Sequence, residues 1–184
     1  MIFKSWVNST VDKNKYDLAY TKRMRIIRAF KALVNELFGT KKEYQVKDLC
    51  VFTCKVCDWW LDKQYFWTGI MRLPFYAEET MILIEGDTSA PFPRQLSELQ
   101  ELLQNWQSMA IQLDNMMSVK IRETHKEKIY ASWQDKFYPD AITVPYSGDS
   151  LEIIFYRKSG VNYSFTVVWK DNTVQKLLLG GMGA

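Results

Sequence analysis

An α+β domain is the fold class that this sequence predicts, with two amino-terminal helices and one long helix packed on a small carboxyl-terminal antiparallel β-meander. Three observations predict it. Apolar residues recur at helical spacing before residue 68, a heptad-like pattern follows residue 97, and apolar residues alternate after residue 150. The chain has 184 residues, 47% of them hydrophobic and 15% aromatic, which suffices for a core of its own.

We expect residues 1–184 to form a single domain, because no internal repeat, low-complexity tract or linker divides the sequence. Four parts follow one another along the chain. They are a helical, basic part (1–68), a strand and loop (69–93), a long helix (94–138) and the antiparallel meander (139–184).

The amino-terminal part predicts two helices. In residues 12–38, apolar side chains such as Phe30, Val34 and Leu37 recur at steps of three and four, which places them on one helical face. Residues 46–66 predict a second helix with apolar residues on more than one side. Such a helix is usually packed between neighbours.

A short apolar run at residues 80–85 predicts a strand, and the longest periodic element follows it. Ser97 and Gln100 have the spacing of a capping box, so we expect the long helix to begin there. A charged stretch interrupts its apolar pattern after residue 120, and Pro139 is expected to end it.

The carboxyl-terminal part predicts an antiparallel sheet. Large apolar residues occupy every second position in 151–156 (Leu151, Ile153, Phe155) and again in 161–169, and 173–179 supplies a third strand. Turn residues separate these runs, which favours a meander. Residues 141–146 are a candidate fourth strand.

Heptad-like spacing in the long helix marks a candidate partner-binding stripe. Two interpretations remain open: the stripe packs against the domain's own sheet, or it contacts another protein chain. The candidate partner-binding residues are Leu102, Trp106, Met109, Leu113 and Met116.

Positive charge is concentrated near the amino terminus. Residues 1–48 contain 11 Lys and Arg against 5 Asp and Glu, whereas the whole chain has a net charge of only +3. A basic helix face is a candidate contact for phosphates, although such a face is more often simply solvated. The candidate nucleic-acid-binding residues are Lys22, Arg25, Arg28 and Lys31.

Three cysteines, Cys50, Cys54 and Cys57, have the spacing with which radical S-adenosylmethionine enzymes hold three irons of a [4Fe-4S] cluster. In the predicted second helix they fall at i, i+4 and i+7, where only two of them reach one metal. Free cysteine is also a common small apolar core residue. We therefore predict structural cysteines and no metal or cofactor, with an iron–sulfur or metal enzyme as a remote alternative.

Catalytic residues do not emerge from this sequence. The one histidine, His125, sits in a charged run that is typical of a solvated helix face. We therefore expect a non-enzymatic structural or assembly protein that acts through protein–protein contacts in an oligomer or larger complex, for instance a viral particle. The aromatic and methionine content and an unpaired edge of the meander favour association. A nucleic-acid-binding or regulatory accessory domain is the alternative.

We expect a cytoplasmic location, or a virion location for a viral component. The longest apolar runs are too short to cross a bilayer, and the first ten residues do not have the pattern of a secretory signal. The few cysteines, crowded into one segment, agree with a reducing compartment.

Overall fold

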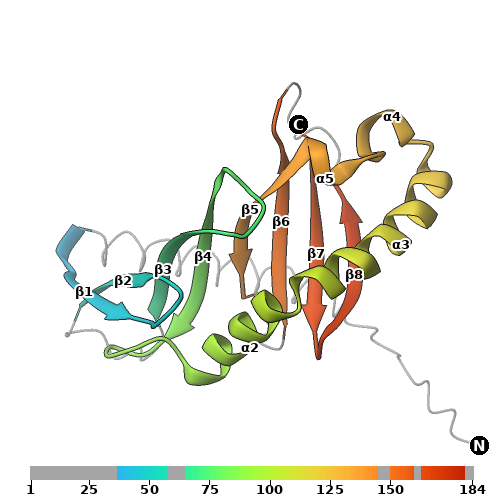
Figure 1. Cartoon of the computed structure of the whole chain (residues 1–184). Coiled ribbons are helices and arrows are strands. Elements are labelled where there is room, and N and C mark those ends of the chain that lie inside the picture. The colour runs from blue at the N-terminus through green and yellow to red at the C-terminus, as the bar shows by residue number, and fades with distance from the viewer. Residues whose placement is uncertain (1–36, 58–64, 145–149, 160–162, 181–184) are drawn as a thin grey trace, which may run out of the picture.

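The computed structural model of this chain describes residues 37–57, 65–144, 150–159 and 163–180. In this part of the chain, eight strands form one sheet, and their order in space follows their order in the sequence (Figure 1). The strands are β1 (Thr40–Gln45), β2 (Val51–Val56), β3 (Tyr65–Arg72), β4 (Glu79–Gly86), β5 (Phe137–Thr143), β6 (Leu151–Arg157), β7 (Ser164–Lys170) and β8 (Thr173–Leu179).

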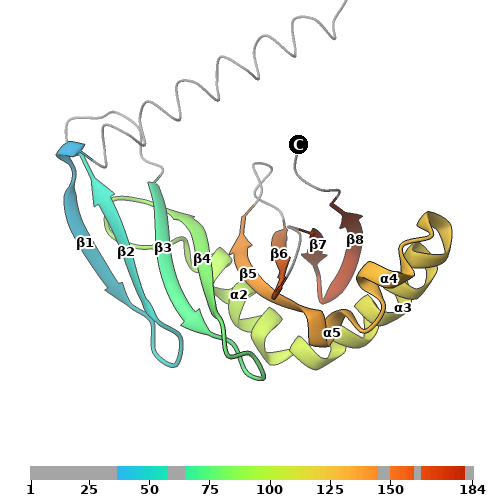
Figure 2. The ribbon, with the colours of Figure 1, turned by 90° about the horizontal axis from the view of Figure 1, so that it is seen from above.

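Neighbouring strands are antiparallel except at the centre of the sheet, where β4 and β5 run parallel. A parallel pair needs a crossover connection. Here the crossover consists of α2 (Pro93–Gln104), α3 (Trp106–Thr124) and the short helices α4 (Glu127–Tyr130) and α5 (Trp133–Lys136). Helices α2 and α3 run across one side of the sheet (Figures 1 and 2). We call that side the covered face and the opposite side the open face.

The predicted fold class is wrong, because the structure is dominated by a mixed sheet and not by two amino-terminal helices on a small meander. Residues 46–66 contain β2 and the start of β3 where a helix was predicted. In β2 the buried side chains are Phe52, Cys54 and Val56, which is the two-residue period of a strand. Residues four apart, such as Phe52 and Val56 or Cys50 and Cys54, also share a face in a helix, and this is why the segment resembled a helix with two apolar sides.

The first predicted helix, at residues 12–38, lies almost wholly outside the described residues. The predicted long helix at 94–138 is divided, since α2 and α3 meet at Asn105 and α3 ends before His125, which has a left-handed φ of 53°. Ser97 lies inside α2, so the capping box is not formed. Pro139 lies within β5, next to an irregularity in its pairing with β6, and does not end a helix.

Strands were found where the sequence predicted them at 80–85 and through most of the carboxyl-terminal region. Strands β6, β7 and β8 pair antiparallel in the predicted order. They do not form a separate small sheet, however, because β5 joins them to β4. At this junction the Thr80 hydroxyl donates a buried hydrogen bond of 2.7 Å to the Pro139 carbonyl oxygen.

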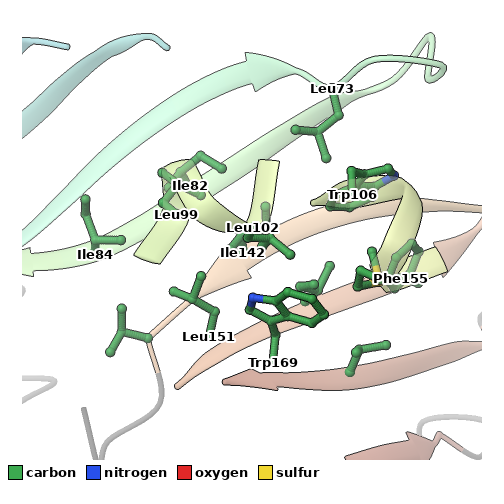
Figure 3. Packing of buried hydrophobic residues seen from close by; sticks show 14 of the residues in the cluster. Leu73, Ile82, Ile84, Leu99, Leu102, Trp106, Ile142, Leu151, Phe155 and Trp169 are labelled. Carbon is green, nitrogen blue, oxygen red and sulfur yellow. The ribbon is translucent and has the colours of Figure 1, made fainter. Parts of the chain in front are cut away.

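The core lies between the covered face and the crossover helices. Leu99 and Leu102 of α2 point toward Ile82 and Ile142 of the sheet (Figure 3), and all four are fully buried. Toward β7 the core is aromatic. Phe155 stacks on Phe165 with ring centroids 4.6 Å apart, and the Trp133 ring meets both of them edge-on. Such packing stabilises the fold through large buried areas.

Candidate association surfaces

The open face of the sheet carries an apolar row that crosses six strands. Because side chains alternate along a strand, residues next to the core positions point to the open face. The strand register then places one open-face residue of each strand opposite one on the next strand. The row consists of Ile70, Met81, Ala141, Ile154, Thr166 and Leu178. We call these six residues the apolar row.

Several members of the apolar row are exposed in the folded chain. Ile70 is 59% exposed, Met81 42% and Leu178 43%, while Ala141 is buried between its neighbours. Phe66 of β3, on the same face, is 47% exposed. Exposed apolar side chains that share one face of a sheet mark an interaction site more often than scattered ones do.

The open face carries charges of both signs. Arg72 of β3 lies 3.9 Å from Glu79 of β4, and Lys41 of β1 lies 2.8 Å from Glu43. The open face is therefore not a basic patch of the kind that attracts phosphates. A surface with mixed charge and an apolar centre resembles a protein–protein interface.

The two outer strands differ in how their free edges are protected. β1 carries Lys41, Lys42 and Glu43, and charged side chains on an edge strand oppose pairing with another chain. β8 has the sequence TVQKLLL, with Lys176 as its one charged residue. The β8 edge is therefore the less protected of the two.

A groove of about 780 Å³ runs between β8 and the second half of α3. Its apolar lining includes Met116 and Val119 of α3 with Leu177 and Leu179 of β8. Residues from both faces of β8 line it, which places the groove at the free edge of the sheet. We call it the edge groove.

The predicted partner-binding stripe of the long helix is part of the core. Four of its five members, Leu102, Trp106, Met109 and Leu113, are buried beneath α2 and α3. Met116 is partly buried and lines the edge groove. Of the two interpretations left open by the sequence, packing on the domain's own sheet is the one that describes this fold.

The predicted nucleic-acid-binding residues Lys22, Arg25, Arg28 and Lys31 lie outside the described residues. The interpretation that depends on them therefore stays a prediction.

The three cysteines lie on and beside β2 and not on one helix turn. An extended chain advances about 3.3 Å per residue, so the Cα atoms of Cys50 and Cys54 are separated by roughly 13 Å, too far for a shared metal ion. Among the described residues, no group of three His, Cys, Asp or Glu side chains could hold a metal ion. Cys54 and Cys57 are both buried, and burial raises the pKa of the Cys54 thiol to about 11. A thiol with such a pKa is a poor nucleophile at neutral pH.

Two further polar residues, His125 and Asp87, are exposed or have a structural role. His125 is exposed in the turn after α3. The Asp87 carboxylate accepts hydrogen bonds from the backbone N–H groups of Ser89 (2.6 Å) and Ala90 (3.0 Å), and these bonds lower its pKa. It therefore stabilises a turn.

Sequence reasoning missed the apolar row and the edge groove. Strands β3 and β4 are apolar on both faces, so alternation alone does not tell which face is exposed. The groove combines residues about 60 positions apart in the sequence. The low charge of residues 173–179 was the sequence signal from which an unprotected edge strand could have been predicted.

No protein-family model matches this chain, and neither a curated protein nor a solved structure shows significant similarity to it. In the part of the chain that the structure describes, no helix has the length and apolar character required to cross a membrane.

Proposed function

We propose that this protein is a non-enzymatic assembly subunit that associates with copies of itself through the open face of its sheet. The observation that carries the proposal is the apolar row, in which Ile70, Met81 and Leu178 stay exposed after the helices have covered the other face. Assembly in the cytoplasm, for instance into a multi-subunit complex or a viral particle, is the biological setting that we propose.

Mixed charge supports a second copy as the occupant of the open face. Two identical surfaces of one charge sign would repel each other, whereas a face with both signs can pair with itself. Arg72 and Glu79 lie beside the apolar row, and Glu152 and Lys176 extend the alternation of charge toward β8. Apolar contact between two rows would supply the main favourable free energy.

An enzymatic role has no support among the described residues, because the cysteines are separated along an extended strand and no metal-binding cluster is found there. The nucleic-acid alternative depends on residues outside the described part of the chain. Neither alternative is favoured by a specific contact in this fold.

Sedimentation velocity of the full chain over a concentration series tests the proposal. We compare the wild type with Ile70→Glu, which places a charge in the apolar row, and with Ile111→Glu, which makes the same change on the outer side of α3. Ile111 is 64% exposed, so it is a matched control away from the open face.

We expect the wild type and Ile111→Glu to associate as concentration rises. Ile70→Glu should weaken association by about tenfold or more, because a charge must then be desolvated in the interface. Circular dichroism should show all three chains folded. A wild type that stays monomeric at every concentration, or equal association of the two variants, would reject self-association through this face.

A further inference from the structure

The backbone of β8 has unpaired groups at the edge groove. The Gly180 N–H donates to the Ser164 carbonyl oxygen at 2.9 Å, which makes Ser164 and Gly180 a hydrogen-bonded pair of the antiparallel ladder. Such pairs alternate along a ladder, so Leu178 also bonds to β7. The backbone groups of Leu177 and Leu179 therefore point away from β7, into the edge groove.

The start of this edge is already occupied by α3. The Gln112 side-chain oxygen accepts a hydrogen bond of 2.9 Å from the Val174 N–H, and its Nε2 donates to the Asn172 carbonyl oxygen at 3.2 Å. The Gln112 side chain thus forms hydrogen bonds with two backbone groups at the start of the β8 edge. Beyond it the helix and the strand leave the groove between them, beside Leu177 and Leu179.

The lining of the edge groove specifies what can fill it. Met116 and Val119 of α3 face the side chains of Leu177 and Leu179, which favours apolar residues on one side of an added strand. Val119 is 48% exposed in the folded chain and would be covered by that strand. Unpaired backbone groups require the occupant to be extended.

Charge at the groove favours an acidic occupant. Lys120 is paired with Glu123 at 3.0 Å, whereas Lys126 and Lys176 also line the groove and have no ion-pair partner among the described residues. The positive surplus disfavours the β8 strand of a second copy, which would bring its own Lys176 into the groove. An acidic group on the occupant would be attracted to both lysines.

We propose that the edge groove binds an extended peptide segment of a partner protein, which adds to β8 as a ninth strand. The segment has apolar residues at alternate positions, facing Met116 and Val119, and an acidic residue near Lys176. This is β-strand addition, in which backbone hydrogen bonds provide affinity and alternate side chains provide specificity. The groove shares Lys176 and Leu178 with the β8 end of the open face but does not include Ile70. The Ile70→Glu variant therefore distinguishes this binding from the self-association proposed above.

Selection from a displayed peptide library tests the inference with defined probes. The library encodes extended peptides of about six residues, the usual length of a strand, with all residue types at each position. We expect selection on the full-length wild-type chain to enrich alternating apolar residues with an acidic residue at one end. An enriched peptide is then synthesised, together with a copy N-methylated at the amides that would bond to β8.

Binding of the synthetic peptide is measured against three variants of the full chain. Val119→Asp should weaken binding by about tenfold or more, since a carboxylate would be buried against apolar residues. Ile111→Asp, the same kind of change elsewhere on α3, should bind as the wild type does. Ile70→Glu should also bind normally, which separates this inference from self-association. The N-methylated peptide should not bind.

Amide hydrogen exchange identifies the strand that is extended. On peptide binding, the amides of Leu177 and Leu179 should become protected, while the Leu178 amide, already bonded to β7, should change little. The inference would be overturned by a library that yields no binder, by equal binding to Val119→Asp, or by protection confined to other strands. A wild-type oligomer that Val119→Asp dissociates would overturn it in favour of a second copy in the groove.

Discussion

Replacement of Leu113 by alanine tests whether the heptad-like stripe is core. Leu113 is fully buried in the centre of α3, in the cluster that includes Met109 and Met117. The change removes three carbon atoms, worth about 2.4 kcal/mol of transfer free energy at ~0.8 kcal/mol each. The cavity left behind raises the expected loss in the free energy of unfolding to roughly 3–5 kcal/mol.

Urea unfolding, followed by circular dichroism and tryptophan fluorescence, measures this loss. For a chain of this size, 3–5 kcal/mol corresponds to a fall in melting temperature of roughly 6–20 °C. Ile111→Ala is the matched control, since Ile111 lies two positions earlier on the same helix and is 64% exposed. Its stability should change by no more than about 0.5 kcal/mol.

The reasoning fails if Leu113→Ala is as stable as the wild type, or if Ile111→Ala loses as much. Either result would mean that the face of α3 that carries Leu113 is not packed against the sheet. Met109→Ala should behave like Leu113→Ala, because Met109 is also fully buried. If these variants stay folded but lose a bound partner, the stripe is an interface and not core.

Three further predictions concern backbone geometry and the buried thiol. Gly86→Ala should destabilise the chain by about 3 kcal/mol or more, because the new methyl would overlap the Ala90 carbonyl oxygen. Gly69→Ala should cost less, about 1–2 kcal/mol, because the new methyl meets the Cys50 Sγ, which can rotate, and lies 3.0 Å from the buried Phe52 ring. Cys50→Ala should restore part of that loss in urea unfolding. Phe75→Gly should raise stability by about 1 kcal/mol, since Phe75 has a φ of 73° and is 82% exposed; a loss in the same assay would mean that its ring makes a stabilising contact. Burial raises the pKa of the Cys54 thiol from 9.0 to about 11, so the unfolded chain loses this proton first and stability should fall as pH rises from about 9 to 11. That fall should be smaller in Cys54→Ala, and equal slopes in the two chains would contradict the assignment.

The secondary structure could be predicted from the sequence in some segments and not in others. Alternation predicted β6 and β7, because every second residue is large and apolar in both segments: Leu151, Ile153 and Phe155 in β6, and Phe165, Val167 and Trp169 in β7. The same alternation is present in 52–56, where Thr53 and Lys55 separate Phe52, Cys54 and Val56. Residues four apart, such as Phe52 and Val56, share a face in a helix as well as in a strand, so local periodicity could not decide.

The sequence by itself determined that the chain has a large apolar and aromatic core, where its carboxyl-terminal strands lie, and that the stripe from Leu99 to Leu113 is apolar. Tertiary structure alone decided that this stripe is covered and that the apolar row is not. Burial depends on which elements meet in space, and the parallel pairing of β4 with β5 places the crossover helices on one face only. The edge groove likewise exists only because α3 and β8, far apart in sequence, meet beside the last strand of the sheet.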